Sequence, residues 1–303
     1  MSILLDNSLA SSTISVYKRA WILFNEAFKE ISGGLKYSLP LHFSHILMFI
    51  SYLNLLRFAS SSITTYITAI SYIHKFGDFK DPTTHFSVQK TLSAVNRLTG
   101  KLDSRLPITI FILARLSDAI EKTVSNRYHR VLLRAMFTSA FFGLFRIGEI
   151  TTEGHNVVCL DMSQCNLLED KVIIKIVHFK HNVSQDPVIL SFSKQSDKLI
   201  CPVTAMGKYF EFRGLDSGPL FCFLNKKPVT RKFFSQKLKN CLNFCGFDLK
   251  AYKCHSFRIG GASYLSSLGY SDSQLRKLGR WNSNAFLLYI RNQIFMIPSI
   301  SSS

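Results

Sequence analysis

Apolar side chains recur every three or four residues in four stretches of the first hundred residues, which is the spacing of one buried helix face. In the first stretch this face carries Ile14, Tyr17, Trp21, Phe24 and Phe28. Three further helices are predicted over residues 46–56, 63–73 and 88–98. The front of the chain, residues 1–100, is therefore predicted to be an all-helical domain.

The pattern changes behind this domain. Gly100 and Pro107 interrupt the helical spacing, so residues 101–109 are predicted to be a linker. Two runs rich in β-branched residues then flank a polar turn, which predicts a β-hairpin over residues 171–192 with Lys180 at its tip. Further predicted helices cover residues 110–122, 127–144, 202–213, 231–244, 255–268, 273–278 and 284–291. The expected fold is mainly α with a small antiparallel β-sheet, and the second domain, residues 110–303, is of the α+β class.

The composition is that of a folded protein. The chain has 303 residues, of which 47% are hydrophobic, enough for a core in each of two domains. Its apolar runs fall short of the roughly 20 residues of a membrane span, and no secretory signal is recognisable, so we expect an intracellular protein without a membrane segment. The seven cysteines contain no C-x-x-C pair, so reduced thiols are expected. A zinc site of Cys241, Cys245, Cys254 and His255 is disfavoured because its spacing matches no common zinc pattern.

The chain is strongly basic. Lys and Arg number 37 against 19 Asp and Glu, which gives a formal charge of +18. Between residues 221 and 258 nine Lys or Arg accompany a single acidic residue, Asp248, and phenylalanines lie among them. A nucleic acid is the natural partner of such a surface, and a solvated basic face is the alternative. The predicted DNA contacts are Lys226, Lys227, Arg231 and Lys232.

Two motifs place arginines where an anion could bind. In FFGLFRIGEI, Arg146 ends an apolar helix and needs a partner if buried, which Glu149 can supply; a purely structural ion pair is the alternative. In HSFRIGGAS, His255 and Arg258 are three residues apart and share a helix face, and Gly260 lets another backbone approach. The forked guanidinium suits a phosphate, although a surface salt bridge would give the same spacing.

A third motif, LGRWNSNAFLLYIR, carries Trp281 and Tyr289. Each motif is common in isolation, but their order in the chain is distinctive: Arg146, Lys180, His255-x-x-Arg258, Trp281 and Tyr289. This series resembles the tyrosine recombinases, or phage integrase family, over nearly the whole chain. SRLPIT, HSFRIGGAS and LGRWNSNAFLLYIR look most like recombinases of the DIRS, Ngaro and Crypton groups of eukaryotic transposable elements.

The resemblance implies a SAM-like core-binding domain followed by a catalytic domain. It implies that Tyr289 attacks a DNA phosphate to form a 3′-phosphotyrosyl link, without cofactor or metal. Arg146 and Arg258 would bind the phosphate oxygens. The other implied roles are a general acid for Lys180, a base or donor for His255, packing or an indole N–H donor for Trp281, and an orienting role for Glu149.

Two departures from the family pattern accompany this assignment. Trp281 stands where many bacterial members have histidine, and the step from it to Tyr289 is one residue shorter than is common. Lys175 lies on the same predicted strand as Lys180 and is the alternative active-site lysine.

The expected partners are double-stranded DNA and three more copies of the chain, as a homotetramer on two DNA duplexes in the nucleus. The segment after Tyr289 would dock on a neighbouring copy through Phe295, Met296 and Ile297. The alternatives are a type IB topoisomerase-like strand relaxer, a catalytically inactive transposon-derived DNA-binding protein, and a basic helical scaffold. Neither the target DNA sequence nor the choice between a mobile element's enzyme and a host-adopted gene follows from the sequence.

Overall fold

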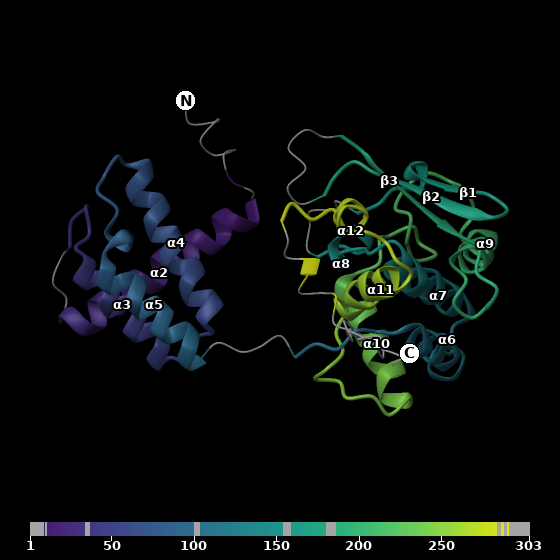
Figure 1. Cartoon of the computed structure of the whole chain (residues 1–303), viewed down its shortest axis with the longest axis horizontal. Coiled ribbons are helices and arrows are strands. Elements are labelled where there is room, and N and C mark those ends of the chain that lie inside the picture. The colour runs from purple at the N-terminus through teal and green to yellow at the C-terminus, as the bar shows by residue number, and fades with distance from the viewer. Residues whose placement is uncertain are drawn as a thin grey trace, which may run out of the picture. The chain divides into compact units, whose positions relative to one another are not determined.

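The chain divides into two compact units, Met1–Asp103 and Ser104–Ser303, each with a separate hydrophobic core (Figure 1). The computed structural model describes residues 9, 11–33, 37–99, 104–153, 159–179, 186–283, 286–287 and 290. No helix in these ranges is both long enough and apolar enough to cross a membrane.

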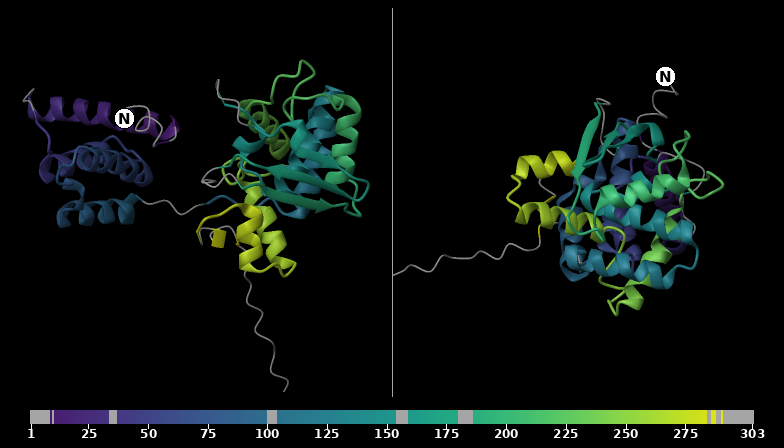
Figure 2. Two further views of the ribbon diagram at one scale, coloured as in Figure 1. Left: turned by 90° about the horizontal axis from the view of Figure 1, so that it is seen from above. Right: turned by 90° about the vertical axis from the view of Figure 1, so that its right-hand side faces the viewer.

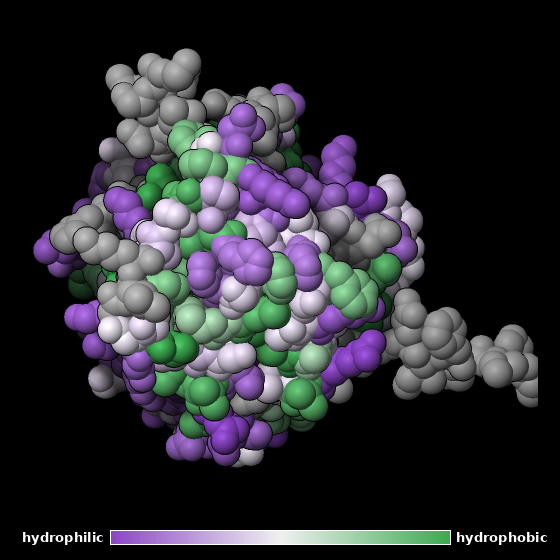
Figure 3. All heavy atoms as spheres, turned by 90° about the vertical axis from the view of Figure 1, so that its left-hand side faces the viewer, coloured by the Kyte–Doolittle hydropathy of each residue, from purple (hydrophilic) through white to green (hydrophobic). Residues whose placement is uncertain are grey.

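The first unit is helical. Its elements are α2 (Ser11–Ser32), α3 (Phe43–Leu55), α4 (Ser60–Phe76), a 3-10 turn η1 (Pro82–Thr84) and α5 (Phe86–Thr99). The predicted apolar faces meet in the core, where Phe24 packs edge-on against Phe49 and both are fully buried. Some apolar side chains remain at the surface, including Ile22 and Phe76, and Figure 3 shows apolar patches interspersed with polar ones on one face of the chain. The four helices predicted from periodicity are all present.

The second unit combines helices with a three-stranded antiparallel sheet. Its elements are α6 (Ile110–Thr123), α7 (Arg127–Phe142), α8 (Ile147–Ile150), η2 (Met162–Gln164), β1 (Cys165–Leu167), β2 (Lys171–Ile176), β3 (Val188–Ser193), α9 (Pro202–Arg213), α10 (Arg231–Phe244), α11 (Ser256–Ser267) and α12 (Asp272–Gly279). The strand order is β1-β2-β3, and Val172 and Ile174 of β2 lie opposite Phe192 and Leu190 of β3. The fold is thus mainly helical with a small antiparallel sheet, as predicted.

The layers follow from which faces are apolar. Alternate residues of β2 are buried, and α9 covers the sheet on that side and contacts all three strands. Helix α7 packs against α9 and also against α6 and α11 (Figure 2). Helix α7 is therefore the central helix of the unit, which explains why all seven residues 135–141 are buried.

The end of α7 sets up the corner from which Arg146 projects. The helix was predicted to reach residue 144, but it stops at Phe142, because Gly143 caps it and Leu144 adopts a left-handed conformation with φ 47°. The chain reverses there and α8 starts directly after Arg146. A four-residue helix is too short to show a periodic pattern, so α8 was not predicted.

Residues 104–109 belong to the second unit. Ile108 is fully buried, and its N–H donates to the Ser256 carbonyl, while the Leu106 N–H donates to Ala251. The sequence predicted these residues to be part of a linker. They contact α11 instead, because Gly260 has no side chain and the Ile108 backbone fills that space.

Candidate functional site

Arg146 is fixed at the start of α8 by Glu149. The Arg146 N–H donates to Glu149 Oε2 at 2.8 Å, and its Nη1 lies 3.1 Å from Glu149 Oε1. A glutamate three residues into a helix commonly accepts the N–H of the preceding cap residue in this way. The Arg146 side chain remains 26% exposed, so it is held by an ion pair and still reaches solvent.

Arg258 projects from the first turn of α11 and is almost completely buried. Its guanidinium donates to two backbone carbonyls, those of Leu144 and Gly279. The Trp281 ring lies over it, with 4.3 Å between the guanidinium carbon and the ring centroid, a favourable cation–π arrangement. Arg258 thus joins α11 to the end of α7 and to the end of α12.

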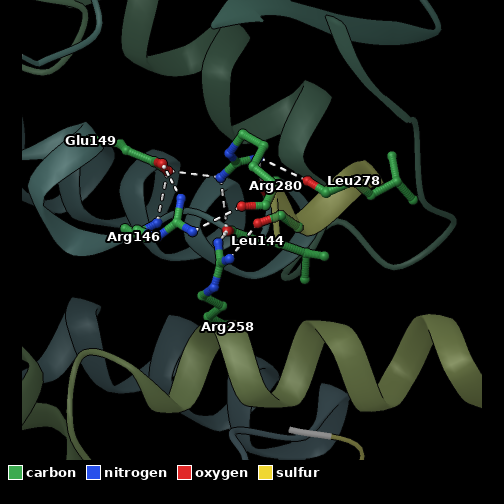
Figure 4. Close-up of polar contacts among 8 residues, drawn as sticks. Leu144, Arg146, Glu149, Arg258, Leu278 and Arg280 are labelled. Carbon is green, nitrogen blue, oxygen red and sulfur yellow. Dashed lines mark hydrogen bonds and ion pairs between the residues drawn. The ribbon is translucent and has the colours of Figure 1, made fainter. Parts of the chain in front are cut away.

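Arg146 and Arg258 meet on consecutive backbone carbonyls. Arg146 Nη2 donates to the carbonyl of Arg280 at 3.0 Å, next to the Gly279 carbonyl that accepts from Arg258. Figure 4 shows both guanidinium groups pointing toward this stretch of backbone from different elements. Two arginines that are 112 positions apart in the sequence therefore converge.

A third arginine, Arg280, lies at the centre of this cluster. Its side chain is fully buried and donates to Glu149 Oε2 at 2.7 Å and to the carbonyls of Leu278 and Leu144 at 2.8 and 3.0 Å. Arg280 adopts the left-handed conformation, φ 56° and ψ 47°, which costs a residue with a side chain roughly 1 kcal/mol.

The sequence analysis did not select Arg280. The signal available was a basic residue between a helix-terminating glycine and a tryptophan. Glycine is the usual left-handed residue after a helix, so the local sequence does not predict an arginine in that conformation. Gly279 instead ends α12 itself, and a side chain there would collide with the Trp281 ring.

The charge balance of the cluster favours an anion. Burial alone would raise the pKa of the Glu149 carboxyl, but the charge and hydrogen bond of Arg280, and then those of Arg146, hold that pKa below its ordinary value. Among the described side chains, Glu149 thus pairs with two guanidinium groups, and the third, that of Arg258, adds a positive charge beside them. Guanidinium forks with a net positive charge match the oxygens of a phosphate.

The fold was compared with known proteins. A scan against protein-family models and a search of curated proteins found no match. Solved structures do match: a lambda integrase dimer bound to a COC′ core site has a TM-score of 0.63 at 13% identity, covering 100% of this chain and 78% of that one. XerH site-specific recombinase bound to difH DNA has a TM-score of 0.66 at 17% identity, covering 91% and 75%. The Tn1549 transposon integrase bound to transposon right-end DNA has a TM-score of 0.65 at 12% identity, covering 95% and 91%.

The chain has the tyrosine recombinase fold. Lambda integrase has also been solved as a tetramer bound to a Holliday junction, with a TM-score of 0.57 to this chain.

Other candidate residues of the recombinase fold take the following positions. His255 immediately precedes α11 and is half-buried, and its carbonyl accepts the N–H of Arg258. The Trp281 ring contacts both the Arg258 guanidinium and the Phe286 ring. Lys175 lies on the solvent face of β2, opposite Ile189.

The predicted DNA contacts occupy one turn and the adjoining helix start. All four side chains are exposed: Lys226, Lys227, Arg231 and Lys232. Lys226 lies 2.8 Å from Asp216, and Arg231 lies 2.8 Å from Glu153. Backbone bonds from Thr152 to residues 229 and 231 link this region to the segment that follows α8.

Several predicted residues lie outside the described ranges. They are Lys180, Tyr289, Phe295, Met296 and Ile297, together with most of the predicted helix 284–291. Within the described part of the chain, no three His, Cys, Asp or Glu side chains lie close enough together to hold a metal ion.

Proposed function

We propose that this protein is a site-specific DNA recombinase that cuts and rejoins strands through a tyrosine–DNA intermediate. The observation that carries the proposal is the convergence of Arg146 and Arg258 on consecutive backbone carbonyls within a tyrosine recombinase fold. Backbone carbonyls hold both guanidinium groups in place and Arg146 remains 26% exposed, so the pair supplies fixed positive charge for binding a phosphodiester.

In the proposed reaction the Tyr289 hydroxyl oxygen attacks a backbone phosphorus. The bond from phosphorus to the 5′-oxygen breaks, a 3′-phosphotyrosyl ester forms, and the 5′-oxygen leaves with a proton as a hydroxyl. The 5′-hydroxyl of another strand then attacks the phosphotyrosyl ester, which releases Tyr289 and joins the strands. Each step exchanges one phosphate ester for another.

Each side chain meets a specific demand of this reaction. Tyrosine has a pKa near 10, so the Tyr289 proton must be removed or its developing charge stabilised at neutral pH. His255 is proposed as the base or as a donor to the phosphate, and Lys180 as the acid that protonates the 5′-oxygen, with Lys175 as the alternative. Trp281 holds the face of the Arg258 guanidinium.

We further propose that the protein is the recombinase of a mobile element of the DIRS, Ngaro or Crypton type and acts in the nucleus. The amino-acid sequences of the three motifs support this proposal. The lambda integrase tetramer on a Holliday junction supports a homotetramer on two duplexes. The +18 charge supports double-stranded DNA as the partner.

The test is covalent capture. The protein is incubated with nicked duplexes from its flanking genomic DNA, without added metal, and a denaturing gel is examined for a protein–DNA adduct. Wild type should form the adduct and Tyr289→Phe should not. Tight, salt-sensitive DNA binding without any adduct would instead indicate a catalytically inactive DNA-binding protein, and relaxation of plasmids without a specific site would indicate a topoisomerase.

The arginines are tested by conservative variants. Arg146→Lys and Arg258→Lys keep the charge and lose the fork, and each should slow adduct formation by about 100-fold, the typical effect of removing one oxyanion donor. Single-turnover cleavage measures the rate, and Arg276→Lys, an exposed position on α12, is the matched control. Wild-type rates in both variants would rule out the proposed roles.

A further inference from the structure

We propose that Arg280 is a positioning residue that holds Arg146 and Arg258 in register with each other. The proposal rests on the proposed function, because the reaction it serves is phosphoryl transfer at those two arginines. Arg280 itself has a side-chain exposure of 0%, so it acts through its neighbours.

The Arg280 side chain joins three segments of the second unit. Its Nη1 donates to the carbonyls of Leu278 and Gly143, and its Nη2 donates to Leu144 and to Glu149 Oε2. These partners belong to the end of α7, to α8 and to the end of α12. One planar group therefore fixes the relative positions of the elements from which Arg146 and Trp281 project.

Each of the two proposed phosphate ligands, Arg146 and Arg258, shares an acceptor with Arg280. The carbonyl of Arg280 accepts from Arg146, and the carbonyl of Leu144 accepts from both Arg258 and Arg280. Glu149 lies between Arg146 and Arg280, with one oxygen on the Nη1 of the first and the other on the Nη2 of the second. Moving Arg280 therefore displaces acceptors of both other arginines.

The contacts of Arg280 require the planar guanidinium of arginine. Lysine could keep the ion pair with Glu149, but its single ammonium nitrogen cannot reproduce a planar fork that reaches a carboxylate and three carbonyls. Arg280→Lys therefore keeps the positive charge and loses the planar arrangement of donors. Lys277→Ala is the matched control, since it removes an exposed cation from the same helix.

The experiment measures single-turnover cleavage, DNA affinity and thermal unfolding for each variant. Arg280→Lys should cleave about 100-fold more slowly than wild type, with duplex affinity within about threefold, while Lys277→Ala should cleave at the wild-type rate. Cleavage by Arg280→Lys at the wild-type rate would overturn the proposal. If Arg280→Lys does not fold, Arg280→Gly, which tolerates the left-handed turn, takes its place.

A double-mutant cycle distinguishes positioning from general loss of structure. In an Arg146→Ala background, Arg280→Lys should slow cleavage by clearly less than the roughly 100-fold expected in wild type, because its effect through Arg146 is already lost and only its effect through Arg258 remains. A second full 100-fold loss would mean that Arg280 acts independently of Arg146, and the proposal would be wrong.

A spectroscopic readout covers the case in which the proposed function fails. If wild type forms no adduct, the recombinase proposal fails, while the side-chain N–H signals of Arg146 in an NMR spectrum still report its position. Arg280→Lys should shift these signals and Lys277→Ala should leave them in place. Unchanged signals in Arg280→Lys would overturn the positioning role whatever the chemistry.

Discussion

Glu149 is a buried carboxylate whose charge depends on two arginines. Its side chain is 7% exposed and it contacts Arg146 and Arg280 at the same time. A buried carboxylate is costly unless paired, so removing its charge leaves two arginines without their shared partner. The residue therefore links the stability of the second unit to the arrangement of the candidate site.

This gives a pH prediction. Because the pKa of Glu149 is lowered in the folded protein, its stabilisation is present above the unfolded value of about 4.3 and is lost as pH falls through the folded value. Glu149→Gln should lower the free energy of unfolding by about 3 kcal/mol at pH 7. This difference in stability between variant and wild type should become smaller below about pH 4. Urea unfolding at pH 7 and pH 3 measures it.

The control for this prediction is Glu153→Gln. That carboxylate is 75% exposed and pairs with Arg231 at the surface, so the change should be within about 0.5 kcal/mol at both pH values. A gap for Glu149→Gln that stays constant between pH 7 and pH 3 would contradict the assigned charge state.

At the residue scale, sequence motifs predicted Arg146, Glu149 and Arg258 but not Arg280. The first three stand out because a charge or a spacing marks them locally. Three of the four acceptors of the Arg280 side chain belong to residues 143, 144 and 149, far away in sequence, and its complete burial follows only from how α7, α8 and α12 meet. Contacts of this kind are not encoded in any local pattern.

Helix α11 owes its place in the second unit to two glycines. A side chain on Gly260 would collide with the backbone carbonyl of Ile108, and one on Gly261 with that of Phe141. The first turn of this helix carries Arg258, so the same close approach that packs the helix also delivers the guanidinium to Leu144.

Gly260→Ala should therefore be strongly destabilising. Overpacking against backbone cannot be relieved by a side-chain rotation, and we expect a loss of about 3 kcal/mol in the free energy of unfolding. The matched control is Gly207→Ala in α9, where the nearest atom to an added Cβ is 3.9 Å away and the gain in helix propensity should stabilise by about 0.5 kcal/mol. Urea denaturation compares the two; equal stabilities would refute the packing argument.

At the element scale, the long helices and the hairpin strands were predictable, and the shortest elements, β1 and α8, were not. The periodicity of α2, α4 and α9 is a local property, and β2 and β3 show β-branched runs. Strand β1 has three residues and exists because it pairs with β2, and α8 has four and exists because Glu149 accepts the N–H of Arg146. Short elements are set by tertiary contacts, which the sequence pattern does not contain.

At the scale of the whole molecule, the chain is strongly basic. With a charge of +18, binding to duplex DNA should weaken steeply with salt, and log K should fall linearly with log salt at about −0.9 per phosphate contacted. Lys226 and Arg231 already pair with carboxylates, whereas no ion pair of Lys227 or Lys232 is found among the described residues.

Lys227→Ala and Lys232→Ala should each make the salt slope less steep by about one. Lys226→Ala and Arg231→Ala should change it less, because a phosphate must first displace Asp216 or Glu153. Fluorescence anisotropy with a labelled duplex at several salt concentrations measures the slopes, with Lys208→Ala on α9 as control. Slopes that match wild type in all four variants would place the DNA elsewhere.

The backbone hydrogen bonds of residues 106 and 108 constrain the order in which the two units fold during synthesis on the ribosome. Their partners, at positions 251 and 256, lie nearly half the chain further on. At a synthesis rate of roughly 5 to 20 residues per second, the acceptors are made about 7 to 30 seconds after the donors. The contacts of Met1–Asp103 are complete long before then, so the first unit can close while the second awaits α11. Premature release of the chain before α11 would thus leave one folded unit attached to an aggregation-prone remainder.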